Sequence, residues 1–224
     1  MRPTAAQPLY AYCHGFLSGP ASSKGRHLRS VLLRHGVDLH LLDLNGGGGP
    51  ADLTPACALL AIDAFWTAHG GAPLRLLGSS FGGWAAARYS ELHPGRVERM
   101  LLLAPGFELA SRWSSIIGAD GVAAWRREGA REFIVPASGA VVSIPYAFAE
   151  AVERDVSPPK ITVPTTCVHA LRDHVVTLGA CERAVARSCG AAELVVVDDD
   201  HALTAPATLD EITRQAKRRF SLCP

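Results

Sequence analysis

The sequence has almost no excess charge and no long hydrophobic run. Lysine and arginine number 22 against 21 aspartate and glutamate residues, for a formal net charge of +1. Proteins that bind nucleic acid by neutralising phosphates usually carry a clear basic excess. No apolar run approaches the ~18 residues of a membrane-spanning helix, and the N-terminus lacks the apolar segment and cleavage site of a signal peptide. We therefore expect a cytoplasmic protein without a membrane span or a nucleic-acid partner.

Metal and phosphate motifs are also lacking. The six cysteines are scattered without a CxxC pair, which favours reduced thiols over disulfides or a zinc site. His169, Asp173 and His174 lie close in sequence but do not make a clear tetrahedral ligand set. The glycine run 46–49 is not followed by Lys-Ser or Lys-Thr, so it does not fit a phosphate-binding loop. We expect neither a metal nor a cofactor.

What the sequence does contain is a regular alternation of short apolar segments and longer helical patterns. The expected strands cover residues 9–13, 37–42, 74–78, 100–104, 165–170 and 193–197. The expected helices cover residues 24–35, 54–69, 81–92, 177–188 and 207–220. Segments such as LRLLG and MLLLA are apolar on both faces, as in strands covered by helices on both sides. Thr54 and Pro55 fit the cap and first turn of a helix. The pattern predicts an α/β fold with a doubly wound, mostly parallel sheet.

The interval 105–164 interrupts this alternation. A structureless loop of that length is improbable in a compact domain, so we predict a small helical, cap-like insertion within a single domain spanning 1–224. Trp113 and Trp125 in this interval either line an acyl pocket or anchor the packing. Its arginines either form a solvated helix face or bind an anionic substrate group, such as a coenzyme A phosphate or a carboxylate. These arginines are Arg126, Arg127 and Arg131.

The residues 78–82, Gly-Ser-Ser-Phe-Gly, match the pattern G-x-S-x-G between an expected strand and an expected helix. The pattern alone is weak, but this context is that of a sharp strand-to-helix turn that exposes a serine hydroxyl above a sheet. The N-terminus of the following helix favours negative charge that develops nearby. Ser80 is therefore the candidate nucleophile.

A serine hydroxyl needs a base to remove its proton during attack. His201 follows the sixth expected strand, so it belongs at the same edge of the sheet as Ser80. Asp173, after the fifth strand, is the best candidate to orient the imidazole. The run 198–200 of three aspartates is the competing source of that carboxylate. The chain order Ser, Asp, His is the one typical of a nucleophile on a strand-to-helix turn.

An acyl-transfer site also needs donors for the oxyanion. The amide of Phe81, directly after Ser80, is one candidate. The loop after the first strand, in which Gly15 allows a turn, supplies the second through the amide of Phe16, with Leu17 as the fallback. We expect His14 to brace this loop.

Four segments follow one another along the chain: HGF after the first expected strand, GSSFGGW after the third, then HALRDHVV and DDDHAL. With these segments, the chain resembles the α/β-hydrolase superfamily from about residue 9 to 220. Within it, HGFLSGPASSKGRHL and GSSFGGW look most like small serine esterases and thioesterases, including bacterial esterases and mitochondrial depalmitoylating enzymes. The resemblance implies a compact α/β-hydrolase fold with a sheet of six or seven strands. It also implies Ser80 as nucleophile, His201 as base and Asp173 as acid, with the amides of Phe16 and Phe81 as the oxyanion hole.

We therefore expect a serine hydrolase that cleaves ester or thioester bonds of small or acyl substrates through an acyl-serine intermediate. The expected partner is a small-molecule ester or thioester, with a substrate pocket formed by Leu17, Trp113 and Trp125. Two alternatives stay open. One is a serine peptidase or amidase for small substrates, and the other is a non-catalytic scaffold that binds a ligand or partner. The sequence does not indicate an oligomeric state.

Overall fold

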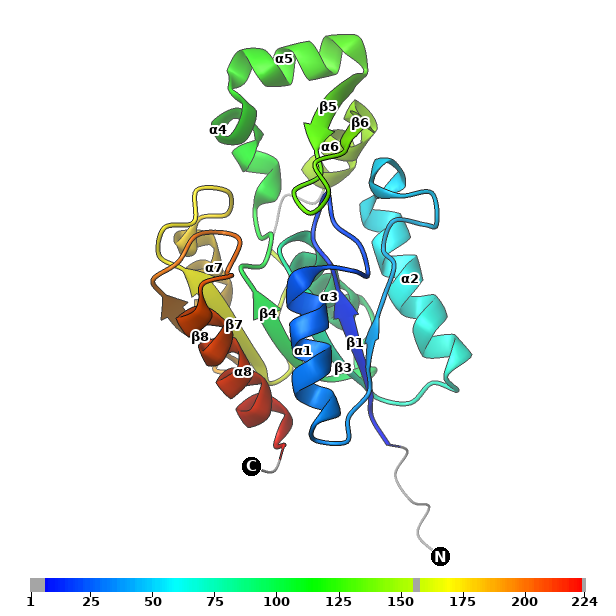
Figure 1. The fold of residues 1–224 in the computed structure, drawn as a ribbon, viewed down its shortest axis with the longest axis vertical. Helices are drawn as coiled ribbons and strands as arrows, with labels where there is room; N and C mark the ends of the chain where they lie inside the picture. The colour runs from blue at the N-terminus through cyan, green and yellow to red at the C-terminus, as the bar shows by residue number, and fades with distance from the viewer. Residues whose placement is uncertain (1–6, 155–157, 223–224) are drawn as a thin grey trace, which may run out of the picture.

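A six-stranded parallel sheet forms the centre of the computed structural model, which describes residues 7–154 and 158–222 (Figure 1). The strand order is β2-β1-β3-β4-β7-β8. The strands are β1 (Leu9–Cys13), β2 (Leu39–Leu41), β3 (Leu74–Ser79), β4 (Val97–Leu103), β7 (Thr165–Ala170) and β8 (Ala192–Val197). All six predicted strands are present. The strand β2 is shorter than expected because it pairs only with β1 and because the Val37 amide bonds to Leu32 O at the end of the preceding helix.

Helices cover both faces of the sheet, as predicted. They are α1 (Ser23–Leu33), α2 (Pro55–Ala68), α3 (Phe81–Leu92), α7 (Leu178–Ala186) and α8 (Pro206–Phe220). Tyr10 and Tyr12 of β1 pack with α1 and α8, whereas Ala11 and Cys13 pack with α2, α3 and α7. This alternation with period two explains why the strands read as apolar on both faces.

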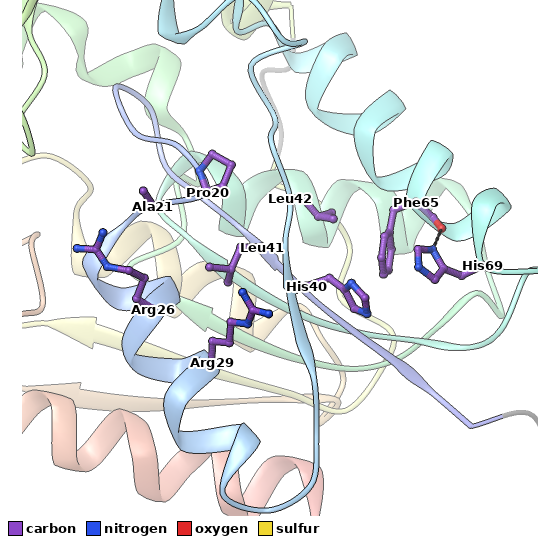
Figure 2. Close-up of a pocket in the computed structure, with 9 residues that line it drawn as sticks. All are labelled: Pro20, Ala21, Arg26, Arg29, His40, Leu41, Leu42, Phe65 and His69. Carbon is purple, nitrogen blue, oxygen red and sulfur yellow. Dashed lines mark hydrogen bonds between the residues drawn. The ribbon is translucent and has the colours of Figure 1, made fainter.

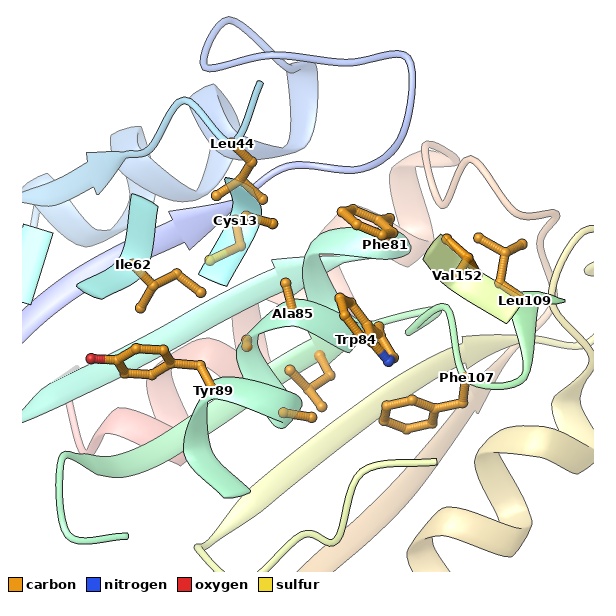
Figure 3. Close-up of a cluster of buried hydrophobic side chains, with 14 of the residues drawn as sticks. Cys13, Leu44, Ile62, Phe81, Trp84, Ala85, Tyr89, Phe107, Leu109 and Val152 are labelled. Atoms are coloured by element: carbon orange, nitrogen blue, oxygen red, sulfur yellow. The ribbon is translucent and has the colours of Figure 1, made fainter. Parts of the chain in front are cut away.

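The helix α3 lies at the centre of the larger core. Figure 3 shows Phe81 and Trp84 of α3 beside Leu109 and Val152 of the insertion, with Tyr89 at the far end of the helix. The helix that begins at the candidate nucleophile is therefore anchored along most of its length in buried apolar side chains.

The start of α2 follows the expected capping. The Cys57 amide donates to Thr54 Oγ at 3.0 Å, and Pro55 occupies the first turn. The helix α1 begins in the same way, because the Gly25 amide donates to Ser22 Oγ at 3.2 Å. Both caps satisfy an amide that has no partner within its helix.

The insertion between β4 and β7 lies beyond one end of the sheet (Figure 1). Its elements are a 3₁₀ turn (Leu109–Arg112), α4 (Trp113–Ile117), α5 (Ala119–Glu128), β5 (Ala130–Ile134), β6 (Val141–Pro145) and α6 (Tyr146–Glu153). It differs from the expected helical insertion because β5 and β6 form an antiparallel hairpin. The two strands are short and largely exposed, so the sequence carries little hydrophobic alternation to reveal them.

The direction in which the chain adds strands reverses between β1 and β3. From β1 the chain passes outward to β2, and it then returns to place β3 on the other side of β1. The loops after β1 and β3 therefore diverge to opposite faces and leave a crevice at the carboxyl ends of these strands. Ligand sites of open parallel sheets lie at such a reversal.

The described residues contain neither a membrane-spanning helix nor a cluster of metal ligands. In the described part of the chain, no helix is both long and apolar enough to cross a membrane. Likewise, residues 7–154 and 158–222 contain no group of three or more His, Cys, Asp or Glu side chains placed to hold a metal ion.

Candidate active site

Ser80 occupies the turn between β3 and α3 with φ 53° and ψ −121°. This backbone conformation is strained for a non-glycine residue and persists only where the surroundings enforce it. A Cβ on Gly78 would lie 2.5 Å from Gly82 O, and a Cβ on Gly82 would lie 2.2 Å from Cys13 O. The flanking glycines are therefore required by close backbone approach, as the motif predicts.

The three side chains that the sequence singled out meet at this turn. His201 Nε2 lies 3.0 Å from Ser80 Oγ, and His201 Nδ1 lies 2.7 Å from Asp173 Oδ2. Asp173 follows β7 and His201 follows β8, so three separate strands bring the groups together at one edge of the sheet. The fold thus brings His201 within hydrogen-bond distance of Asp173, 28 residues away in the sequence, and of Ser80, 121 residues away.

The carboxylate of Asp173 is buried and fully engaged. Its Oδ1 accepts the amides of Val175 and Val176, each at 2.8 Å, while Oδ2 faces His201. Burial raises the pKa of Asp173, but the hydrogen bonds and charge of His201 and the two amides outweigh it, so the pKa lies below its ordinary value. The group therefore stays ionised at neutral pH and can orient an imidazole.

The aspartates of the run 198–200 interact with groups other than His201. Asp199 accepts the amides of Asp200 and Ala205, at 2.8 and 3.0 Å, and Asp200 Oδ1 accepts the Ala202 amide at 2.8 Å. Asp198 is exposed and forms an ion pair with Arg172. These carboxylates shape the loop that carries His201, and the structure places Asp173, not one of them, against the imidazole.

The loop after β1 is braced by His14, whose side chain is completely buried. Its Nδ1 lies 2.9 Å from Gly15 O, so Nδ1 carries the proton and donates to that carbonyl. Nε2 then accepts the Leu44 amide at 3.0 Å. Burial lowers the pKa of His14, despite the opposing effects of Gly15 O and Asp43. Both ring nitrogens of the neutral imidazole therefore form hydrogen bonds, and His14 links the loop after β1 to the loop after β2.

Gly15 brings this loop against the nucleophile. A Cβ on Gly15 would lie 3.3 Å from both Ser80 Cβ and Ser79 O. Phe16 and Leu17 follow, and Leu17 has a φ of 54°. Phe81 opens α3, where a first-turn amide has no acceptor within the helix. The two amides expected to bind an oxyanion thus belong to the segments on either side of Ser80.

The ring of Phe16 is held by aromatic side chains of the insertion. It stacks on Phe148 with a centroid distance of 4.7 Å and contacts Trp113 and Phe133 edge-on at 6.0 and 5.6 Å. Trp125 continues the cluster, contacting Trp113 at 5.3 Å and donating to Ile144 O at 2.8 Å. The sequence did not single out Phe133 or Phe148, because nothing in the pattern links residues so far from the loop.

A cleft of about 600 Å³ opens beside Ser80, within the range of small-molecule sites. Its lining includes Phe16, Leu17, Lys24 and His174, and Pro136 and Ala137 at the tip of the hairpin. Leu17, which the sequence analysis expected in a substrate pocket, lies in the lining of this cleft. Trp113 and Trp125 are 4% and 1% exposed and do not line the cleft, so they anchor the packing rather than form a pocket wall.

A second histidine lies against Asp173. His169 on β7 is completely buried, and its Nε2 lies 3.9 Å from Asp173 Oδ2 without a hydrogen-bond partner. Its Nδ1 lies 3.1 Å from Ala170 O. Burial lowers the pKa of His169. His169 begins the segment His-Ala-Leu at the end of β7. From the sequence, we considered this residue only as a possible metal ligand.

Two further hollows lie away from Ser80. Figure 2 shows one of about 530 Å³ beside the edge strand β2, where Arg29, His40, Phe65 and His69 line it. Arg29 already faces Asp38 at 3.6 Å, and His69 Nδ1 donates to Phe65 O at 2.8 Å. This hollow contains no group of the Ser80 site.

The other hollow lies on the insertion and is lined by Arg126 and Arg127. Arg126 Nε donates to the Tyr146 hydroxyl at 2.9 Å, and Arg131 lies over the ring of Phe133. None of these arginines lines the cleft beside Ser80. They are therefore not placed to bind an anionic group of a molecule in that cleft.

Several solved structures of other proteins have a similar fold. The fold is similar to the alpha/beta hydrolase domain-containing protein 10 from mouse, with a TM-score of 0.79 and 19% identity over 97% of this chain and 91% of that one. It is similar to monoacylglycerol lipase of Paleococcus ferrophilus, with a TM-score of 0.76 and 15% identity over 96% and 95% of the chains. It is also similar to Est1E of Butyrivibrio proteoclasticus, with a TM-score of 0.71 and 16% identity over 98% and 90%.

These likenesses establish the α/β-hydrolase fold. A search of curated proteins found no match. The model of the uncharacterised protein family UPF0227 matches residues 9–214, which is most of the sequence. The chain therefore belongs to the uncharacterised protein family UPF0227 and has the α/β-hydrolase fold.

Proposed function

We propose that this chain is a serine hydrolase that cleaves carboxylic ester or thioester bonds of small molecules through an acyl-serine intermediate. The observation that carries the proposal is the relay in which Ser80 Oγ lies 3.0 Å from His201 Nε2, while His201 Nδ1 lies 2.7 Å from a buried Asp173 carboxylate. The similar folds include a monoacylglycerol lipase, which supports a hydrolase.

Acylation begins when Ser80 Oγ attacks the acyl carbon. His201 Nε2 takes the hydroxyl proton, and Asp173 stabilises the resulting imidazolium through the Nδ1–H hydrogen bond. The carbonyl oxygen becomes an oxyanion that the amides of Phe16 and Phe81 stabilise. The tetrahedral intermediate then collapses, His201 gives its proton to the departing alcohol or thiol, and Ser80 remains acylated.

Deacylation repeats these steps with water. His201 Nε2 removes a proton from a water molecule as its oxygen attacks the acyl carbon, and the same two amides again stabilise the oxyanion. Collapse breaks the bond to Ser80 Oγ, which recovers the proton from His201. The carboxylic acid leaves, and the site returns to its starting protonation state.

The test is labelling with a fluorophosphonate, which reacts with an activated serine without requiring knowledge of the substrate. Intact and peptide mass spectrometry should show one adduct on Ser80, absent in Ser80→Ala and strongly reduced in His201→Ala. Ser111→Ala is the matched control, since Ser111 is exposed and bonded only to Glu108 within its own turn. A folded wild-type protein that gives no adduct overturns the proposal and favours a non-catalytic scaffold.

Substrate screening then separates the bond types. We expect turnover of esters or thioesters of graded acyl length, with loss of several orders of magnitude in Ser80→Ala. Preferential cleavage of a matched amide would replace the esterase assignment with the peptidase or amidase alternative.

A further inference from the structure

Lys24 is a cation in the wall of the cleft beside Ser80. The chain has only three lysines, and Lys24, in the first turn of α1, is the one that lines this cleft. It is half-buried, and its Nζ donates to Ala202 O, the carbonyl directly after His201. The ammonium group therefore lies next to the candidate catalytic histidine.

The charge of Lys24 is poorly compensated. Among the residues that the structure describes, no carboxylate lies within 4 Å of its ammonium group. Asp199 and Asp200 are close enough to act on it, but both are engaged by amides of their own loop. Burial lowers the pKa of Lys24 more than these carboxylates and Asp173 raise it.

The other cation at the cleft is different. The Arg172 guanidinium forms an ion pair with the Asp198 carboxylate and donates to Asp198 O. Its charge is thus matched by a partner in the protein. An ammonium ion has three N–H donors, and the carbonyl of Ala202 takes one of those on Lys24. Two donors and a positive charge without a close ion-pair partner among the described residues remain beside the cleft.

We propose that Lys24 binds an anionic group of the substrate, such as a carboxylate, within the cleft beside Ser80. This inference rests on the proposed hydrolase function and specifies its substrate class. A bound carboxylate would give Lys24 a direct ion-pair partner and would fix the ester relative to Ser80. Lys24 is then a specificity-determining residue, and neutral esters forgo this contact.

The experiment compares matched pairs of anionic and neutral esters. Mono-4-nitrophenyl succinate and 4-nitrophenyl butyrate differ in charge on the acyl side. 4-Acetoxybenzoate and its methyl ester differ on the alcohol side. The quantity measured is the ratio of kcat/KM for the anionic ester to that for the neutral ester, so any general loss of activity cancels.

Lys24→Met should lower this ratio by about tenfold to a hundredfold for the pair whose anion reaches Lys24, as expected for loss of a charged hydrogen bond. Lys24→Arg should retain most of it. Lys160→Met is the matched control, because Lys160 is an exposed lysine outside the cleft, and it should leave both ratios unchanged.

The outcomes separate the two proposals. If Lys24→Met slows both members of each pair equally, Lys24 only positions the His201 loop and the specificity proposal is overturned. If wild type prefers the neutral ester of both pairs, the proposal is also overturned. Failure of wild type to react with any ester or with a fluorophosphonate overturns the hydrolase function itself.

Discussion

Phe16 and Phe148 stack with ring centroids 4.7 Å apart and ring planes inclined by 9°. Phe16 belongs to the loop after β1 and Phe148 to α6 of the insertion, 132 residues later in the chain. The insertion therefore holds in place the loop whose amide we propose to bind the oxyanion. In this protein the insertion contributes to the site by supporting the loop and by bordering the cleft.

Phe148→Ala should show whether Phe148 supports the loop after β1 in addition to stabilising the fold. Removing a buried phenylalanine side chain lowers the free energy of unfolding by about 3–5 kcal/mol. We also expect a lower kcat, because Phe16 loses its stacking partner and its amide is less well placed. Urea unfolding and ester hydrolysis under conditions that keep the variant folded measure the two effects.

The matched control for this change is Phe220→Ala. Phe220 is equally buried but packs with Tyr10 in the core on the other face of the sheet. Phe220→Ala should lower the free energy of unfolding by a similar amount and leave kcat unchanged. Equal losses of kcat in the two variants would contradict a specific role of the stacking.

Asp173→Asn should lower kcat by about 10⁴-fold, a magnitude taken from a serine-protease relay. The amide retains the shape of the carboxylate but removes the charge that stabilises the imidazolium. Steady-state ester hydrolysis measures the loss. Asp198→Asn is the control, since its exposed side chain pairs with Arg172 and does not reach His201. A large loss in Asp198→Asn with a small one in Asp173→Asn would show that we chose the wrong acid.

Stability should fall as the pH drops from about 7.5 to 5. Burial lowers the pKa of both His14 and His169 in the folded chain. In the unfolded chain histidine titrates near pH ~6.5, so below that pH the unfolded state binds more protons than the folded one. Each residue then contributes a slope of at most about 1.4 kcal/mol per pH unit until it is protonated in the fold.

Urea unfolding across this range measures the slope. His169→Gln should reduce it, because the amide side chain does not titrate. The exposed His69, replaced in the same way, should leave it close to that of wild type. An unchanged slope in His169→Gln would mean that the buried imidazole is not held neutral.

Gly82→Ala should disrupt the turn at Ser80. The new methyl group would lie 2.2 Å from Cys13 O and 2.4 Å from His14 O, which are backbone atoms that cannot rotate away. We expect a strong loss of labelling by fluorophosphonate and a lower midpoint of thermal unfolding. Gly179→Ala is the control within another helix, where the nearest atom is the flexible end of Arg183 at 3.3 Å. That change should be neutral or stabilising by up to about 1 kcal/mol; a Gly82→Ala protein as active and stable as this control would refute the close-approach argument.

The local sequence pattern around Ser80 was enough to predict the turn that carries it. A serine between glycines, after an apolar strand and before a helix, has few backbone solutions, and the structure shows the strained turn that this context predicts. The alternation of strands and helices was predicted for the same reason, because burial on both sides imposes a pattern on each segment separately. The hairpin β5–β6 was not predicted, because its short exposed strands carry little pattern.

The sequence by itself determined the parallel sheet, the turn at Ser80 and the order in which the candidate groups occur, since each depends on residues adjacent in the chain. Only the tertiary structure decided that Asp173 and not the run 198–200 faces His201, and that Trp113 is buried in the packing. It alone placed Lys24 beside the cleft. The reason is physical: distances between side chains on different strands depend on how the whole sheet, its helices and the insertion pack together.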